Sequence, residues 1–381
     1  MHGVMFRVIL FFLSCALLSV VHGQVSETER DALIDIYHAT GGDDWHRNQD
    51  WLGAPGSECA WSGVECSGAQ HPEGQFVYRL VLSENNLTGE LPGVLAGLNR
   101  LRSLVVSGND LKGTLPSNLW GIMTLEDLYF ADNRFTGAVP AGILDRPLYR
   151  FRASNNRFSS FANADHLDIR DDLTRELVLD GNELSQLPPI AWQELGRIQR
   201  LNLKANHLAG ELSMASDYWP DLEHLDLADN SLTALHGLSA QTVPALFHLD
   251  LSNNRLEHWP VTYNPMPELH RLLLNGNALG TNWPESGSGL VDLVELKLND
   301  SGLEGPLPGW FSDLALTRLE VDNNALEGPI STLFGGMRDS GRTGLKLFAT
   351  NNRFHGALPA DFDYSQFEPS LTEGGTSRPC G

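Results

Sequence analysis

Basic residues are few in this chain. Lys and Arg together number 26 among 381 residues, against 48 Asp and Glu, which leaves a formal net charge of −22 at pH 7. A surface this acidic repels the phosphate backbones of DNA and RNA, so we expect no nucleic-acid partner. The simplest reason for the charge is the solubility of an elongated molecule.

Long apolar runs are also lacking, with one exception at the start. The segment Val8 to Val21 is apolar, follows Arg7, and ends at small or permissive residues near Gly23. It is shorter than the roughly 20 residues that span a bilayer, which favours a cleaved secretory signal peptide at 1–23 over a membrane anchor. No later stretch is long and apolar enough to span. We therefore expect a secreted, extracellular protein, or a periplasmic or cell-surface one in a bacterium.

Catalytic signatures are absent as well. The sequence has no H-E-x-x-H, no P-loop and no G-x-S-x-G motif, and its 13 histidines are scattered. No pair of carboxylates has an arrangement that suggests acid–base catalysis. We expect a protein that is not an enzyme and that needs no cofactor.

What the chain does have is a repeat. The segment L-D-L-A-D-N-S-L starts at Leu225, and L-D-L-S-N-N-R-L starts 24 residues later at Leu249. An asparagine, replaced once by serine, marks the same place in twelve successive units: Asn85, Asn109, Asn133, Asn156, Asn182, Asn206, Asn230, Asn254, Asn277, Ser301, Asn324 and Asn352.

The alternation in L-x-L places two apolar side chains on one face of a short strand and polar neighbours on the other. One strand cannot bury that face alone, but strands stacked about 4.8 Å apart in a parallel sheet bury a continuous leucine column. The asparagine amide can then pair with backbone groups of the adjacent unit, and losing such a partner costs roughly 1–3 kcal/mol. Ser301 is shorter, so we expect the tenth unit to be looser.

The motif L-x-L-x-x-N-x-L with a period in the low twenties resembles the leucine-rich repeat family, from about Leu80 to Pro359. The resemblance implies an α/β solenoid of about 12 repeats. Its expected form is a right-handed superhelix with a parallel concave β-sheet and a convex side of short helices, 3-10 turns and second strands.

Several units continue into a second signature, a glycine followed by an apolar residue and a proline. Examples are T-G-E-L-P at Thr88 and E-G-P-L-P at Glu304. These units resemble the plant-type subclass, in which a second short strand follows the turn. The pattern is broken around Gln186, His236 and Asn264, so we expect the second sheet to be interrupted there.

Residues 24–76 are expected to form an N-terminal cap ahead of the repeat array at 77–360. Ser26 and Glu29 make a capping box that begins a helix, which two glycines end at 41–42. The segment resembles the cap of secreted leucine-rich repeat proteins, in which the helix and tryptophans (here Trp45, Trp51 and Trp61) cover the open end of the first coil. Residues 361–381 are expected to form a short C-terminal cap and tail.

The four cysteines have different expected roles. In an exported chain Cys59 and Cys66 should form a short disulfide within the cap, and a metal site there lacks a histidine at ligand spacing. Cys15 leaves with the signal peptide. Cys380 is left as a free thiol or an intermolecular bridge.

Two insertions interrupt the period. One carries four aspartates within 165–172, whose spacing does not match an EF-hand loop, so we expect a solvated loop rather than a calcium site. The other carries G-G-M-R-D-S-G-R-T-G at 335–344. Asn86 and Asn299 begin glycosylation sequons, which matter only if the host glycosylates secreted proteins.

The residues on either side of each central strand leucine should point out from the concave face. The residues predicted to bind a ligand there are Tyr129, Arg150, Arg152, Arg200, Asn202, Lys204, His224, Asp226, His248 and Asp250. A basic segment thus adjoins an acidic, histidine-bearing one, and mixed polarity on a rigid surface suits recognition of a protein or peptide. The alternative is ordinary solvated surface, since exposed strand positions tolerate almost any residue.

His224 and Asp226 share the outer face of one strand. His248 and Asp250 repeat the pair on the next strand, within about 7 Å. We expect the two carboxylates to raise each other's pKa unless a cation compensates, as the histidines would if protonated near pH 6. The four side chains could hold a divalent metal, but the sequence shows no groups to orient such ligands. We therefore predict pH-sensitive attraction of a basic partner segment, whose acidic part the neighbouring basic residues would hold.

Three functions of different classes are consistent with the sequence. The first is a secreted, non-enzymatic recognition module, expected to be a monomer, that binds a protein or peptide on its concave face. The second is a cell-wall glycosidase inhibitor or polysaccharide-binding protein, because the plant-type units and the cap are similar to those of polygalacturonase-inhibiting proteins. The third is a structural or adhesive surface protein attached through Cys380.

Overall fold

The computed structural model of the protein describes residues 24–72, 74–144, 148–162, 174–187, 197–214, 219–260, 266, 268–330 and 345–356. The predicted signal peptide, the two insertions at 165–172 and 335–344, and the C-terminal tail lie outside the described residues. Cys15, Asn264 and Cys380 lie outside them too.

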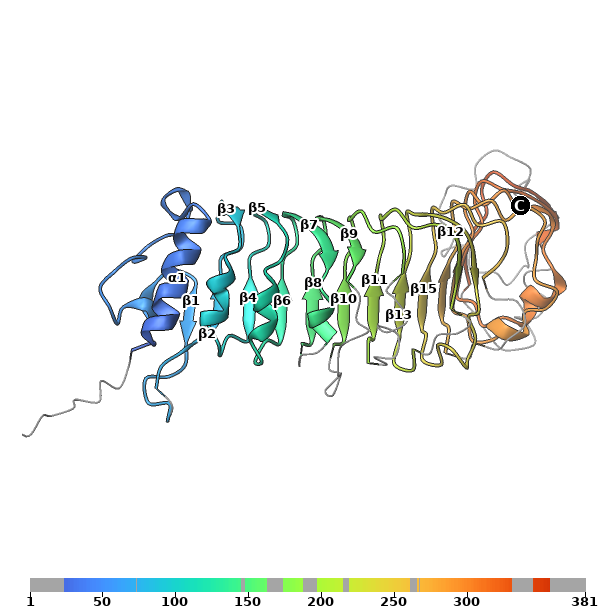
Figure 1. Ribbon diagram of the computed structural model, residues 1–381. Coiled ribbons are helices and arrows are strands. Elements are labelled where there is room, and N and C mark those ends of the chain that lie inside the picture. Colours follow the sequence, from blue (N-terminus) through green and yellow to red (C-terminus); the bar gives the residue numbers. More distant parts are fainter. Residues whose placement is uncertain are drawn as a thin grey trace, which may run out of the picture.

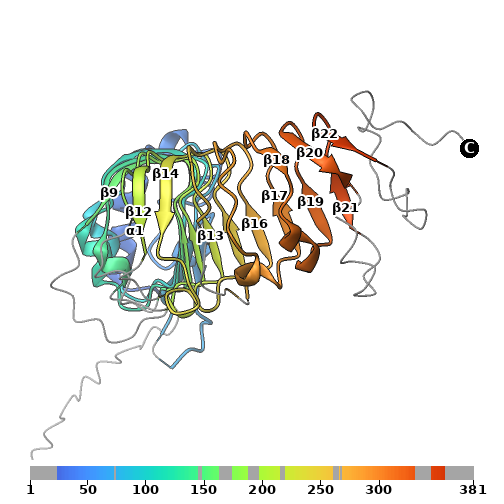
Figure 2. The ribbon, with the colours of Figure 1, turned by 90° about the vertical axis from the view of Figure 1, so that its right-hand side faces the viewer.

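Parallel strands stack into one long sheet, as the repeat predicts (Figures 1 and 2). They are β2 (Val77–Val81), β4 (Ser103–Val105), β6 (Asp127–Tyr129), β8 (Arg150–Arg152), β10 (Glu176–Val178), β11 (Arg200–Asn202), β13 (His224–Asp226), β15 (His248–Asp250), β16 (Arg271–Leu273), β17 (Glu295–Lys297), β19 (Arg318–Glu320) and β21 (Lys346–Phe348). The central residues of neighbouring strands lie opposite each other, as Leu201, Leu225 and Leu249 do. These three side chains are at most 1% exposed, so the leucine column forms the core.

The asparagine column holds the turn after each strand. Nδ2 of Asn230 donates to the carbonyl oxygens of Leu227 and Ala228 in its own coil, both at 3.0 Å. It also donates to Leu203 of the preceding coil at 3.0 Å, and its Oδ1 accepts from the Leu208 N–H at 3.0 Å. Four backbone groups of two coils therefore depend on one amide.

The residue before each asparagine has a left-handed backbone. Its φ is 54° at Asp229 and 53° at Asn253, and all twelve coils have a positive φ at this place. Gly, Asn and Asp occupy it in all coils except those of Glu84 and Ala205. These three residue types tolerate the left-handed region best, so this column of the sequence signals the turn, although the repeat was recognised without it.

Ser301 replaces only part of the asparagine bonding. Its hydroxyl lies 3.2 Å from the Leu274 carbonyl oxygen and 3.1 Å from that of Asn299. In other coils the equivalent of the Leu279 N–H donates to the asparagine Oδ1 of the next coil. Here the Leu279 N–H donates to the backbone carbonyl of Ser301 at 3.0 Å instead. The smaller bonding set is confirmed, and a looser tenth coil stays a prediction.

Second strands flank the main sheet in three groups. They are β3 (Thr88–Glu90), β5 (Asp110–Gly113), β7 (Arg134–Val139) and β9 (Arg157–Phe161), then β12 (Ala209–Ser213) and β14 (Ser231–His236), then β18 (Glu304–Pro306), β20 (Ala325–Pro329) and β22 (Arg353–His355). No strand forms at 183–187, so the predicted interruption near Gln186 is confirmed. The interruption predicted at His236 is wrong, because His236 ends β14 and pairs with Ser213.

Short 3-10 helices cover the rest of the convex side and parts of the cap. They are η1 (Gly42–Asp44), η2 (Glu58–Ala60), η3 (Gly93–Gly97), η4 (Ser117–Gly121), η5 (Ala141–Leu144), η6 (Ser288–Leu290) and η7 (Gly309–Asp313). The mixed convex side that the repeat resemblance implies is thus observed. In the described part of the chain, no helix combines the length and apolar character that a membrane crossing requires.

The N-terminal cap closes the open end of the sheet. Its helix α1 (Glu27–Ala39) begins with the predicted capping box of Ser26 and Glu29, and buries Leu33 and Ile36. The strand β1 (Val64–Cys66) pairs antiparallel with β2 and extends the sheet past the first repeat. Three buried tryptophans pack together beside them: Trp45, Trp51 and Trp61. Cys59 and Cys66 form the predicted disulfide, with their Cα atoms 5.5 Å apart.

Candidate binding surface on the concave sheet

Outward side chains of the N-terminal coils neutralise one another. Nη1 of Arg150 lies 3.4 Å from Oδ1 of Asp127 and 3.3 Å from the Tyr129 hydroxyl. Nε of Arg152 donates to Oε2 of Glu176 at 2.9 Å, and its guanidinium lies 5.8 Å from the centre of the Tyr129 ring. The sequence placed these two arginines and Tyr129 on the concave face correctly, but both arginines already have carboxylate partners.

The C-terminal coils form a second network of ion pairs. Glu295 lies 2.8 Å from Arg271 and 3.6 Å from Lys297. Glu320 lies 2.6 Å from Arg318 and 3.3 Å from Lys297. Burial tends to raise the pKa of Glu320, but hydrogen bonds from Arg318 and Asn299 and the charge of Lys297 outweigh it and lower the pKa.

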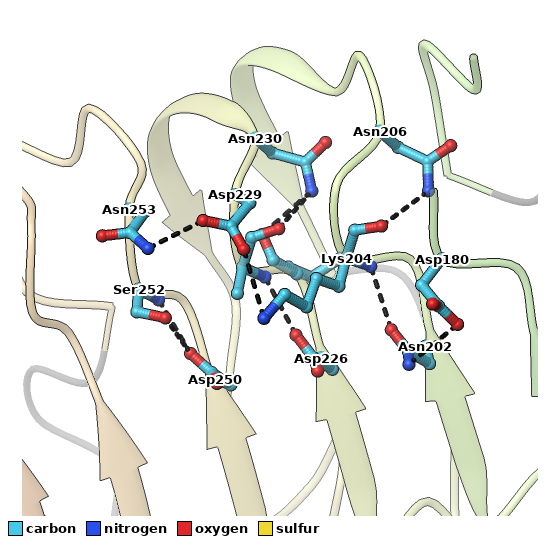
Figure 3. A network of polar contacts seen from close by, with 12 residues as sticks. Asp180, Asn202, Lys204, Asn206, Asp226, Asp229, Asn230, Asp250, Ser252 and Asn253 are labelled. Carbon is cyan, nitrogen blue, oxygen red and sulfur yellow. Dashed lines mark hydrogen bonds and ion pairs between the residues drawn. The ribbon is translucent and has the colours of Figure 1, made fainter. Parts of the chain in front are cut away.

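Between these networks, Asp226 and Asp250 stand side by side in register on β13 and β15. Oδ1 of Asp226 accepts from the Ala228 N–H at 3.0 Å, and Oδ1 of Asp250 accepts from the N–H of Ser252 at 2.9 Å and its hydroxyl at 2.6 Å (Figure 3). Neither carboxylate forms an ion pair within the described chain. Each carboxylate is therefore held in place by hydrogen bonds from the turn after its strand, but no described cation contacts it to compensate its charge.

The pKa of Asp226 is raised from 3.8 to about 6. Burial is the largest cause, because it disfavours the charged form, and the neighbouring charge of Asp250 acts in the same direction. The N–H of Ala228 and the charge of Lys204 oppose the shift. The sequence predicted the direction correctly, but burial rather than charge repulsion leads.

Basic residues of the sixth coil adjoin this pair. Nζ of Lys204 lies 3.2 Å from Oδ2 of Asp229, and this hydrogen bond is the main cause of the raised pKa of Lys204. Asn202 does not face outward freely, since its Nδ2 donates to Asp180 at 3.2 Å and its Oδ1 accepts from the Lys204 N–H at 3.0 Å. Arg200 is exposed and forms no ion pair with the described residues. Of the basic residues predicted to hold an acidic ligand group, Arg200 is the one that is uncommitted.

The two histidines lie at the other end of the same strands. The ring centroids of His224 and His248 are 5.7 Å apart. Burial lowers the pKa of both rings, and Arg271 adds to the effect on each of them. A lowered pKa opposes the expectation that these histidines are protonated and compensate the carboxylates near pH 6, and that expectation stays a prediction. Among the described residues, no three His, Cys, Asp or Glu side chains are grouped so that they could hold a metal ion.

Two hollows at the amino ends of the strands were missed by sequence reasoning. One, of about 670 Å³, is lined by Pro220, Glu223, His224, Pro244, Ala245, Phe247 and Glu268. The other, of about 380 Å³, is lined by Phe247, His270, Arg271, Val294, Glu295, Thr317, Arg318 and Lys346. Several of these residues stand two places before the central strand leucine, a column that the sequence analysis left out. The exposed Phe247 in that column was the available signal.

Profiles of the family described as Leucine rich repeat match residues 220–279 and 100–122. Receptor-like protein 31 of Arabidopsis thaliana is 33% identical to this chain over 98 residues, which are 26% of this chain and 11% of that protein. The chain thus spans a small part of this curated relative.

Solved structures share the fold. The leucine-rich repeat ectodomain of the Arabidopsis receptor kinase HAESA, in complex with an IDA peptide hormone, matches with a TM-score of 0.63 and 24% identity. The match covers 87% of this chain and 54% of that one. The plant peptide hormone receptor RGFR1, in complex with RGF2, matches with a TM-score of 0.58 and 22% identity over 74% of this chain and 45% of that one. At these identities the likeness establishes the fold.

Proposed function

We propose that this plant-type leucine-rich repeat protein is an extracellular, non-enzymatic recognition module that binds a peptide, or an extended segment of a protein, on its concave sheet. The observation that carries the proposal is the uncompensated middle of that sheet. Asp226 and Asp250 point outward in register, and none of the described lysines or arginines forms an ion pair with them, while Arg200 stands exposed nearby. On both sides of them, four outward arginines are already paired with carboxylates of the protein: Arg150, Arg152, Arg271 and Arg318.

The chemistry of the middle coils selects the ligand. A pair of parallel carboxylates, each fixed by backbone N–H donors, favours an arginine or lysine side chain that can reach both. The surface is preformed, since both carboxylates are anchored in turns whose backbone the asparagine column holds. A preformed site loses little conformational entropy on binding, and its charges set specificity more than raw affinity.

The comparisons support this proposal. The receptor ectodomains that share the fold include two whose structures contain peptide hormones. The predicted signal peptide agrees with a place outside the cell. The open, water-accessible hollows favour binding over catalysis, which usually needs a closed and water-poor pocket.

A selection from a random twelve-residue peptide library on the immobilised protein tests the proposal. We expect enriched peptides to carry at least one arginine or lysine, and to bind the Asp226→Asn/Asp250→Asn variant at least fivefold more weakly. The matched control is Asp292→Asn/Asp313→Asn, which removes two exposed carboxylates, one just after η6 and one at the end of η7.

Two results would contradict the proposal. A selection that enriches no peptide would remove the basis for a peptide ligand. Peptides that bind both double variants as tightly as the parent would show that the acidic pair is ordinary solvated surface and that the site lies elsewhere.

A further inference from the structure

Phe247 separates two hollows of opposite charge. It lines both of them, and 39% of its surface is exposed. Its ring stacks on that of His270 with centroids 4.7 Å apart, and meets His224 edge-on at 6.2 Å. An exposed aromatic ring fixed in this way offers an apolar platform between two polar recesses.

The first hollow has an acidic rim. Glu223 and Glu268 are both exposed and neither forms an ion pair within the described chain. Pro220, Pro244, Ala245 and His224 supply the remaining wall, and among the described residues no lysine or arginine lines this hollow. The acidic rim suits the ammonium or guanidinium group of a ligand, with its aliphatic stem against the prolines.

The second hollow has a basic rim. Its lining carries the three positive charges of Arg271, Arg318 and Lys346 against the one carboxylate of Glu295. The adjoining ion pair of Lys297 and Glu320 adds one charge of each sign. The carboxylates are recessed, with 15% and 11% of their side chains exposed, whereas Lys346 is exposed and forms no ion pair with the described residues. A net positive recess in a chain of net charge −22 is a local departure that suits an anionic ligand group.

We propose that the ligand of this protein is an extended peptide segment with the charge order basic, apolar, acidic, read along the stack from β13 toward β21. The basic side chain enters the acidic-rimmed hollow, an aromatic or aliphatic side chain rests on Phe247, and an acidic side chain enters the basic-rimmed hollow. The inference rests on the proposed function and specifies the ligand of the same surface.

The fold also sets the spacing of the two ligand charges. The acidic-rimmed hollow is centred on β15, and Arg318 of the basic rim lies on β19, three strands farther along the sheet. Neighbouring strands are about 4.8 Å apart, so the separation is about 14 Å. An extended peptide advances about 3.3 Å per residue, which places the two charged residues about four positions apart.

A set of synthetic peptides measures this spacing directly. Each is a fluorescent twelve-residue peptide of Ser and Gly that carries one Lys, one Glu and a Phe midway between them, with two to seven positions from Lys to Glu. Both chain orders are included, because the stack does not fix the direction of the peptide. We expect fluorescence anisotropy to show the tightest binding at a separation of four, about tenfold tighter than at two or seven.

Variants of the protein assign each ligand charge to its hollow. Glu223→Gln/Glu268→Gln should weaken the best peptide at least fivefold, but should not affect the same peptide with Gln in place of Lys. Lys346→Gln should weaken the best peptide about threefold, but not its Glu-to-Gln version. All three residues are exposed and form no ion pair with any residue that the structure describes, so the variants should fold. Lys112→Gln, on the second sheet, is the matched control.

The inference fails if affinity does not depend on the separation, if no peptide of the set binds, or if the variants weaken charged and uncharged peptides equally. Such a result leaves the proposed function standing when library peptides still bind and still require Asp226 and Asp250. When the library selection also enriches nothing, the proposed function fails with the inference.

Discussion

Asp226 is a partly buried carboxylate whose ionisation opposes folding. Its pKa is about 6 in the folded protein and 3.8 as a free side chain, mainly because it is buried. The unfolded chain therefore loses this proton near pH 4, whereas the folded chain keeps it until about pH 6. The carboxylate destabilises the fold increasingly as the pH rises through this window, and the effect is absent below it.

Replacing Asp226 by asparagine should relieve this cost. The asparagine Oδ1 can still accept the Ala228 N–H that fixes the turn. We expect the variant to be about 1 kcal/mol more stable than the parent at pH 7.5, less than the full pKa shift would imply because solvent screens the site. At pH 4 the difference should vanish. Urea unfolding of parent and variant at the two pH values measures these differences. Equal stability of the two proteins at pH 7.5 would argue against a folding cost from the ionised Asp226.

The same titration should make ligand binding pH-dependent. Lowering the pH from 7.5 to 5.5 protonates Asp226 and removes one charge that attracts a basic peptide. Burial and Arg271 lower the pKa values of His224 and His248. We expect a library-selected peptide to bind severalfold more weakly at pH 5.5, and the Asp226→Asn/Asp250→Asn variant to bind weakly and equally at both. If the affinity of the parent protein does not change across this pH range, Asp226 is not the titrating group that attracts the peptide.

Replacing Asn230 should cost more stability than replacing a residue in the column one place before the repeat asparagines, such as Asn253. Alanine at 230 leaves three carbonyl oxygens and one N–H of two coils without their partner, and we expect a loss of about 2–3 kcal/mol. The control is Asn253→Gly. Asn253 is exposed, and its side chain bonds Asp229 alone among the described residues. Glycine is chosen because the φ of 53° at this position would strain an alanine. Thermal unfolding measures the stability of the Asn230→Ala and Asn253→Gly variants. Equal losses of stability would mean that the asparagine amides do not hold the coils together.

The strands and turns were the most predictable elements, because their cause repeats in every unit. L-x-L fixes which side chains enter the core, and the asparagine fixes the turn, so β13 and β15 begin and end at equivalent residues. The second strands were less predictable. β14 forms without the glycine–proline signature because pairing with β12 uses backbone groups and absorbs the difference in a register shift near Gly210.

The binding surface was predictable only in part. The sequence shows which residues face outward, so it placed Asp226 and Asp250 together. It does not show which outward charges meet one another, so Arg152 was expected to be available although Glu176 holds it. The hollows around Phe247 depend on how three neighbouring coils pack at their amino ends. No motif in a single unit encodes that arrangement.

Weakening the N-terminal cap should destabilise the neighbouring coils and leave the distant ones unchanged. The Cys59–Cys66 disulfide holds β1, the antiparallel strand that covers the edge of the first coil. A short closed loop contributes about 2 kcal/mol in the chain-entropy account. In the Cys59→Ser/Cys66→Ser variant we expect amide hydrogen exchange to rise first at 58–81, while coils around β15 keep their protection. A uniform rise along the chain would show that the cap and the array unfold as one unit.

For the whole molecule, the sorting of charge matters more than its total. The chain is strongly acidic, yet its concave sheet runs from paired charges at β8, through an acidic middle at β13 and β15, to a basic recess at β16 to β21. This order follows the sequence, because a solenoid maps chain position onto distance along the stack. A linear ligand can therefore be recognised by the order of its own charges.

That mapping requires an elongated molecule, and solution scattering tests it. Twelve strands about 4.8 Å apart give a stack about 53 Å long, and α1 with its loops extends one end further (Figure 1). A globule of this many residues would have a radius of gyration near 21 Å and a diameter of about 54 Å. We expect a monomer whose pair-distance distribution is asymmetric. Its peak should reflect the width of one coil, and its tail should extend well beyond the diameter of the globule. A symmetric distribution that ends near 54 Å would contradict the stacked arrangement on which the spacing of the ligand charges depends.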